Sequence, residues 1–103
     1  MYGTVARMRL KPGVEAQMKE QLTRFEALDV PGFVTTYIYR MDADPDEIYM
    51  AVVFKDREAY FANANSPEQH SRYEQMRALL AADPEWHDGE IVYAGQATPA
   101  PTG

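Results

Sequence analysis

His70 is the residue in this sequence best suited to acid–base chemistry, and it lies in a stretch that is predicted to be helical. Tyr73 and Glu74 follow it at i+3 and i+4, so the three side chains share one side of the helix. An imidazole exchanges protons near neutral pH and can act as a general base when a neighbour orients it. We therefore predict catalytic roles for His70 and Tyr73. The alternative is an exposed histidine in an ordinary helical side-chain pair.

Trp86, His87 and Asp88 form a second group of candidates, directly before the last predicted strand. An aspartate beside a histidine can orient its ring, and a tryptophan can stack on a ligand. We predict that Trp86 and His87 contact substrate. The alternative is that Trp86 covers an edge of the core, while His87 and Asp88 face in different directions.

An amide and several phenols complete the set of predicted binding residues. Asn63 can bind a substrate carbonyl, and Tyr37 and Tyr60 can form hydrogen bonds to a ligand oxygen. The alternative for the tyrosines is packing in the core or in a subunit interface. No metal site is predicted, because the sequence has no cysteine and its two histidines lie on separate elements. We expect no cofactor.

The composition favours a single small globular domain. The chain has 103 residues and a net charge of −6. Basic and acidic residues number six and four in residues 1–40, and four and twelve in the remainder. This distribution offers no basic surface, so we expect neither nucleic-acid binding nor membrane binding. A strand pattern that starts at Tyr2 leaves no room for a signal peptide, and we expect a cytoplasmic location.

The hydrophobic pattern alternates with period two in some segments and with helical period in others. Ser66 is a predicted helix cap that accepts from the Gln69 amide while the Gln69 side chain reaches back, and Asp56 is a predicted cap for a shorter helix. Asp88 and Gly89 are expected to form a turn. The predicted strands are Tyr2–Leu10, Phe33–Arg40, Ile48–Phe54 and Glu90–Gly95; the predicted helices run from Val14 to just before Pro31, over Arg57–Ala64, and from Pro67 to near Asp83.

The order of these elements is β-α-β-β-α-β, with the second helical segment broken in two. It predicts an α+β fold of the ferredoxin-like type, with a four-stranded antiparallel sheet and the helices on one face. We expect one domain over residues 1–95 and a flexible tail over residues 96–103.

The second and third strands are apolar on both faces. In the second, Phe33, Tyr37 and Tyr39 are expected on one face, and Val34 and Ile38 on the other. One layer of helices covers only one face of a sheet, so the other face needs a different cover. We predict a homodimer that packs sheet against sheet. The third strand shows the same double pattern, with Ile48, Met50, Val52 and Phe54 opposed to Tyr49, Ala51 and Val53.

Four short segments carry a resemblance to a known family. They are Val5–Leu10 running into Lys11-Pro12-Gly13, then Val30–Phe33, Phe54–Tyr60 and Ser66–His70. With them, residues 2–95 resemble the antibiotic biosynthesis monooxygenase-like (ABM) domains of the dimeric α/β-barrel superfamily.

The resemblance implies a cofactor-independent monooxygenase that acts on a small aromatic, phenolic or polyketide-like compound. In such enzymes a dry pocket between helices and sheet holds an electron-rich phenol, whose carbanion reacts with oxygen directly. His70 would then remove the phenolic proton. The alternative is a non-catalytic dimeric module that binds a small apolar or aromatic ligand.

The superfamily also contains a haem-degrading branch, which uses an Asn on the first strand, a Trp on the short helix and an axial His. The aligned positions here hold Ala6, Asn63 and Tyr73. These differences predict weak or no haem binding and no haem breakdown.

Overall fold

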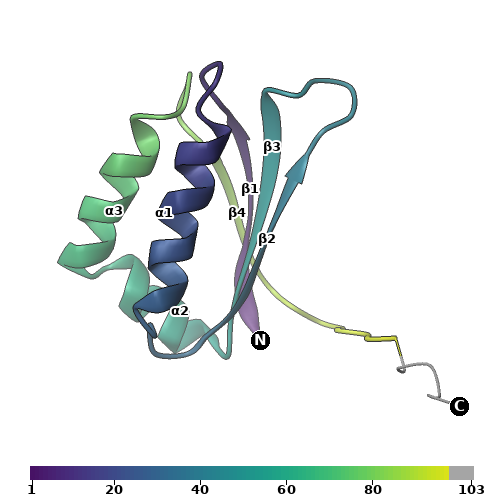
Figure 1. The fold of residues 1–103 in the computed structure, drawn as a ribbon. Helices are drawn as coiled ribbons and strands as arrows, with labels where there is room; N and C mark the ends of the chain where they lie inside the picture. Colours follow the sequence, from purple (N-terminus) through teal and green to yellow (C-terminus); the bar gives the residue numbers. More distant parts are fainter. Residues whose placement is uncertain (98–103) are drawn as a thin grey trace, which may run out of the picture.

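A computed structural model describes residues 1–97 and contains four strands and three helices in the predicted order (Figure 1). The ferredoxin-like prediction is confirmed. Along the chain the elements are β1 (Tyr2–Arg9), α1 (Glu15–Ala27), β2 (Phe33–Arg40), β3 (Glu47–Phe54), α2 (Arg57–Ala64), α3 (Pro67–Arg77) and β4 (Glu85–Glu90).

The four strands form one antiparallel sheet in the order β2-β3-β1-β4. All three helices lie on the same face of this sheet, and the opposite face carries no element of the described chain (Figure 1). We call the first the helix face and the second the open face. The central strand β1 pairs with β3 and β4, so its inward side chains lie under the middle of the helical layer.

The core lies between the helix face and α1. Alternate residues of β1 point to it, as the sequence pattern predicts, and Ala6 and Met8 are 0% and 2% exposed. Met18 of α1 is equally buried against them. The remaining buried members of this cluster are Leu10, Ile48, Met50 and Leu80.

The predicted helix starts are confirmed. The Asp56 carboxylate accepts a hydrogen bond from the Ala59 amide at 2.7 Å, and the Ser66 hydroxyl accepts from the Gln69 amide at 3.1 Å. Each cap satisfies an amide that the first helical turn leaves unpaired. The Gln69 side chain does not reach back to the cap as predicted, because its oxygen accepts from the Arg72 guanidinium instead.

The predicted end of the third helix and the predicted bounds of the last strand are both wrong. Helix α3 ends at Arg77, because the following residues leave the helix to pair with the end of β1: the Leu79 carbonyl accepts from Lys11, and Ala81 donates to the Arg9 carbonyl. The last strand is Glu85–Glu90 rather than Glu90–Gly95, so Asp88 and Gly89 lie within it and form no turn.

The pairing and the exposure of β4 explain why the hydrophobic pattern of the sequence did not predict this strand. Its register runs from Arg7 opposite Glu85 to Tyr2 opposite Glu90, and all six residues of β4 are exposed. An edge strand of this kind carries little apolar alternation. Of the predicted tail over 96–103, residues 98–103 lie outside the described residues, and the domain boundary at residue 95 stays a prediction.

The prediction that Phe33 shares a face of the sheet with Tyr37 and Tyr39 is wrong, because β2 contains a bulge. The pairing of β2 with β3 shifts between Phe33 and Thr35. Phe33 therefore lies on the helix face, where its ring packs on Phe25 and Phe54, while Val34 and Tyr37 lie on the open face. The extra residue of a bulge reverses the alternation on one side of it, which no period-two pattern reveals.

Candidate functional site

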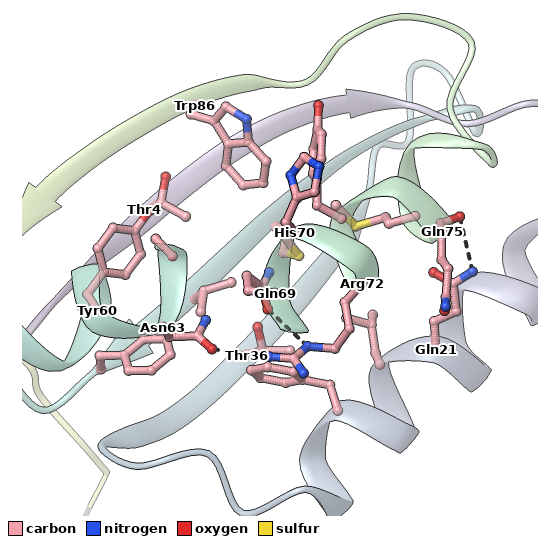
Figure 2. A pocket seen from close by; sticks show the side chains of 18 of the residues that line it. Thr4, Gln21, Thr36, Tyr60, Asn63, Gln69, His70, Arg72, Gln75 and Trp86 are labelled. Atoms are coloured by element: carbon pink, nitrogen blue, oxygen red, sulfur yellow. Dashed lines mark hydrogen bonds between the residues drawn. The ribbon is translucent and has the colours of Figure 1, made fainter. Parts of the chain in front are cut away.

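A pocket of about 670 Å³ lies between the helix face and the three helices (Figure 2). Its apolar wall comes from β3 and from the inner sides of the helices, and it includes Met18, Leu22, Phe25, Met50, Val52 and Phe61. The volume suits a ligand of two or three fused rings, and an apolar wall with few polar groups is typical of small-molecule sites.

Asn63 presents a fixed amide to this pocket. Its side-chain oxygen accepts a hydrogen bond from Arg72 Nη2 at 3.2 Å, and Arg72 Nε donates to the Gln69 oxygen at 3.0 Å. The Arg72 guanidinium also lies 5.3 Å from the centre of the Phe25 ring. Because the amide oxygen is engaged, the Asn63 NH₂ group remains available as a donor to a ligand oxygen.

Tyr60, Asp88 and Thr4 form a second polar group at one end of the pocket. The Tyr60 hydroxyl donates to Asp88 Oδ1 at 2.8 Å. Burial, followed by the hydrogen bond to the Asp88 carboxylate, raises the pKa of Tyr60 well above its ordinary value, so this phenol stays protonated. Thr4 is 5% exposed and its hydroxyl makes no close hydrogen bond in residues 1–97, but it lies near enough to the Tyr60 oxygen to act on the pKa of that phenol in the opposite direction.

His70, Tyr73 and Trp86 line the rim of the pocket. The Tyr73 and Trp86 rings are 6.2 Å apart between centres, and together they form an aromatic wall. His70 Nε2 lies 3.1 Å from Glu74 Oε1, the i+4 neighbour, and the His70 side chain is 73% exposed. The histidine thus stands at the entrance, where solvent and a bound ligand both reach it (Figure 2).

The structure brings five of the seven predicted site residues to one pocket: Asn63, Tyr60, His70, Tyr73 and Trp86. It does not bring Tyr37 and His87 there. His87 pairs with Val5 across the sheet, on the open face, whereas Trp86 pairs with Ala6 on the helix face. The His87 ring contacts Glu85 at 3.0 Å, and Asp88 turns to the opposite face, so Asp88 does not orient it.

Sequence reasoning missed Thr4, Gln69 and Arg72 as pocket residues. Thr4 is a polar side chain in an otherwise apolar alternation on β1, and this irregularity could have identified it. Arg72 could not be found in this way, because its role depends on a contact across the break between α2 and α3.

Residues 1–97 contain no group of three or more His, Cys, Asp or Glu side chains placed to hold a metal ion. Within the same residues, no helix has the length and apolar character needed to cross a bilayer.

Comparisons with solved structures identify the fold. SnoaB, a cofactor-independent oxygenase from Streptomyces nogalater crystallised as an Asn-to-Ala variant, superposes with a TM-score of 0.75 at 20% identity, over 90% of this chain and 94% of that one. A presumed antibiotic biosynthesis monooxygenase from Chloroflexus aurantiacus gives 0.72 at 27% identity, over 92% and 96%. A conserved protein from Methanosarcina mazei gives 0.72 at 17% identity, over 85% and 89%.

No curated protein matches the sequence. The family model of the antibiotic biosynthesis monooxygenases, in contrast, matches residues 1–75, which contain β1 to β3, α1, α2, most of α3 and all the polar pocket residues just described except Asp88. The chain therefore belongs to the antibiotic biosynthesis monooxygenase (ABM) family.

Proposed function

We propose that this protein is a cofactor-independent monooxygenase that oxidises a small aromatic, phenolic or polyketide-like compound. The observation that carries the proposal is the half-open apolar pocket with one anchored amide donor, Asn63, and a histidine at its entrance. Membership of the ABM family and the fold shared with SnoaB support it.

The chemistry needs three contributions from the protein. A base removes a proton from an activated C–H or O–H group, a donor stabilises the oxyanion that forms, and an apolar surround keeps water from the carbanion. His70, held by Glu74, is the proposed base. The Asn63 NH₂ group, held by Arg72, is the proposed oxyanion donor.

The overall reaction balances without another reductant. A ring CH₂ group and O₂ give a ring C=O group and water. The carbanion passes electrons to O₂ and the carbon–oxygen bond forms, which gives a hydroperoxide. As the C=O group forms, the hydroperoxide loses water, which carries away the second C–H hydrogen. The substrate therefore supplies all the electrons. Tyr73 and Trp86 would hold the flat ring in place during these steps.

A homodimer is the assembly that we propose for this enzyme. ABM-family proteins are typically dimeric. On the open face Val34, Tyr37 and Tyr39 are 49%, 58% and 56% exposed, which is unusual for a sheet in contact with water only. A second copy packed on this face would cover them and would also bury His87 and Val5. Tyr37 and His87 would then serve the interface rather than the pocket.

Oxygen uptake with a panel of anthrones and hydroquinones tests the proposal. We expect turnover with at least one of them, and Asn63→Ala to lower kcat roughly 10²–10³-fold, as the loss of an oxyanion donor does. Asn65→Ala is the matched control, because Asn65 ends α2 outside the pocket and should leave the rate unchanged. The absence of any uptake, together with a raised melting temperature in the presence of these compounds, would favour the ligand-binding module instead.

A further inference from the structure

Arg72 brings a positive charge to the wall of the pocket. Its guanidinium is half-buried and lies on the Phe25 ring of α1. Among the other arginines, five contact a carboxylate: Arg7, Arg9, Arg24, Arg40 and Arg77. Within residues 1–97 Arg72 forms no such ion pair, not even with Glu68 one turn before it, and its partners are two amide oxygens and the ring. The charge of this arginine therefore faces an apolar pocket without a counter-charge.

The same guanidinium orients the two amides that it contacts. Arg72 Nη2 donates to the Asn63 side-chain oxygen at 3.2 Å, and Arg72 Nε donates to the Gln69 side-chain oxygen at 3.0 Å. Because a guanidinium only donates, each amide must present its oxygen to Arg72 and turn its NH₂ group elsewhere. Figure 2 shows both oxygens turned to Arg72 and both nitrogens turned away from it. Both residues line the pocket, so it receives two oriented donors from neighbouring helices.

Two donors beside an unpaired positive charge complement one kind of ligand atom, a negatively charged oxygen. Hydrogen bonds to an ionised acceptor are roughly twice as strong as those to a neutral one. A carbonyl oxygen gains little from the charge of Arg72, whereas an oxyanion gains from the charge and from both amides. An arrangement that is fixed before the charge develops needs no reorganisation when it does.

We propose that Asn63, Gln69 and Arg72 form one oxyanion site, in which Gln69 is a second donor and Arg72 is a positioning residue. Arg72 acts through the two amides, whose NH₂ groups it directs into the pocket, and it supplies the counter-charge. The role of the site in the reaction rests on the proposed function, because removal of a proton by the base leaves a negative charge on the substrate. Binding of an anion to the site does not require turnover.

The pKa of a bound phenol tests the site directly. The probe is 2-hydroxyanthraquinone, which is already oxidised and absorbs at longer wavelength once its hydroxyl ionises. Ionisation spreads the negative charge over the hydroxyl oxygen and a ring carbonyl, so either oxygen reports when it occupies the site. We expect wild-type protein in excess to lower the pKa of the probe by about one unit or more, which corresponds to roughly tenfold tighter binding of the ionised form.

Other ionisable groups near the probe are the same in every variant, so differences between variants report on the site alone. Those that line the pocket are Arg24 from α1, Tyr60 from α2, His70 and Tyr73 from α3, and Asp88 from β4, and Glu68 lines a neighbouring cavity beside Arg72.

Two variants remove the site in different ways. Arg72→Met removes the charge and keeps an apolar stem, and should raise the pKa of the bound probe by about one unit or more. Gln69→Glu keeps an oxygen for Arg72 but replaces the donor by a negative charge, and should raise that pKa at least as far. A glutamate at this position of the first turn of α3, three residues after the Ser66 cap, is favourable for the helix, so the fold should be kept.

Gln75→Glu is the matched control for Gln69→Glu, because it makes the same change on the same helix. Gln75 is exposed, and its backbone carbonyl accepts from Gln21 at the other side of the pocket (Figure 2). Solvent screens a charge there, so the pKa of the bound probe should move by less than about 0.3 units. Melting curves of each variant confirm that the fold is intact before the titrations are compared.

The outcomes separate the oxyanion site from the enzyme activity. The site is overturned by a wild-type protein that does not bind the probe or leaves its pKa unchanged, and by a lowered pKa that persists in both Arg72→Met and Gln69→Glu, whether or not the protein consumes oxygen. A lowered pKa that both variants abolish and the control keeps supports the site. The same result in a protein without oxygen uptake supports the site and contradicts the proposed oxygenase.

Discussion

The two faces of the sheet are both rich in apolar residues, but this chain covers only one of them. On the helix face Ile48 and Phe54 are 1% exposed, whereas on the open face Tyr37 and Tyr39 are more than half exposed. The difference does not follow from the composition of β2 and β3. It follows from the position of the helices, which supply enough apolar surface for one face and leave the other to a partner.

The polar residues of the two faces differ in the same way. On the open face, ion pairs such as Arg7 with Glu47 and Arg9 with Asp44 lie on the surface and are satisfied within the chain. On the helix face, the Asn63 amide lines a cavity, and Arg72 holds its oxygen and leaves its NH₂ group available to donate. An available donor that lines an apolar cavity can bind a ligand oxygen, whereas the paired charges of the open face already have their partners.

The largest effect is expected from truncating the helix face. Phe54→Ala removes a buried ring that packs on Phe33 and Tyr60, and should lower the free energy of unfolding by roughly 3–5 kcal/mol. Urea denaturation followed by circular dichroism measures it. Tyr39→Ala on the open face, studied in a monomeric background, should lose less than about 1 kcal/mol. Equal losses would show that the two faces do not differ as described.

The next largest effect is expected from a substitution on the open face, in the surface that the proposed dimer buries. Val34→Asp introduces a charge into the proposed interface, and should raise the dimer dissociation constant at least about a hundredfold, since an unpaired charge is costly to bury. Light scattering over a dilution series measures the change. Val92→Asp, at a side chain that is 92% exposed beyond β4, should leave the dimer intact. A wild-type protein that is monomeric at micromolar concentration would exclude the interface.

Substitutions at two glycines test how closely α2 packs against the segment that precedes β2. Gly32 and Gly13 both have positive φ, of 79° and 77°. A Cβ at Gly32 would lie 2.5 Å from the Ala59 Cβ, whereas a Cβ at Gly13 would meet nothing within 4 Å. Gly13→Ala should therefore lose only the roughly 1–2 kcal/mol of backbone strain, and Gly32→Ala about 1 kcal/mol more. Thermal and urea unfolding compare the two variants, and equal losses would contradict the close contact.

Most of the fold could be predicted from the sequence, because alternation on β1 and helical periodicity on α1 are local signals that burial amplifies. The bulge at Val34 and the strand Glu85–Glu90 could not, since each is defined by pairing with a distant strand. The same distinction between local signals and distant contacts applies to the candidate site. His70, Tyr73 and Asn63 were found by residue type and helical spacing, but the contact of Asn63 with Arg72 and the contact of Tyr60 with Asp88 depend on how separate elements meet.

A smaller effect is expected at Thr4. Thr4→Val removes a buried hydroxyl without a partner and keeps the side-chain shape, so the free energy of unfolding of the ligand-free protein should stay the same or rise by about 1 kcal/mol. Urea denaturation measures it. A loss of similar size would mean that the hydroxyl already has a hydrogen-bond partner in the folded protein, such as the neighbouring Tyr60 oxygen.

The smallest effect concerns the satisfied charges of the open face. The hydrogen bond from Arg9 and, second, the Asp46 amide lower the pKa of Asp44. A lowered folded-state pKa stabilises the fold above the ordinary aspartate pKa, and the stabilisation is lost as the pH falls through the folded value. Arg9→Gln should bring the pKa of Asp44 part of the way back, because the Asp46 amide remains. A carboxyl titration by NMR measures this shift, and acid unfolding should become slightly less steep. An unchanged pKa would show that the Arg9–Asp44 pair is too exposed to matter, and that the open face depends on its apolar residues alone.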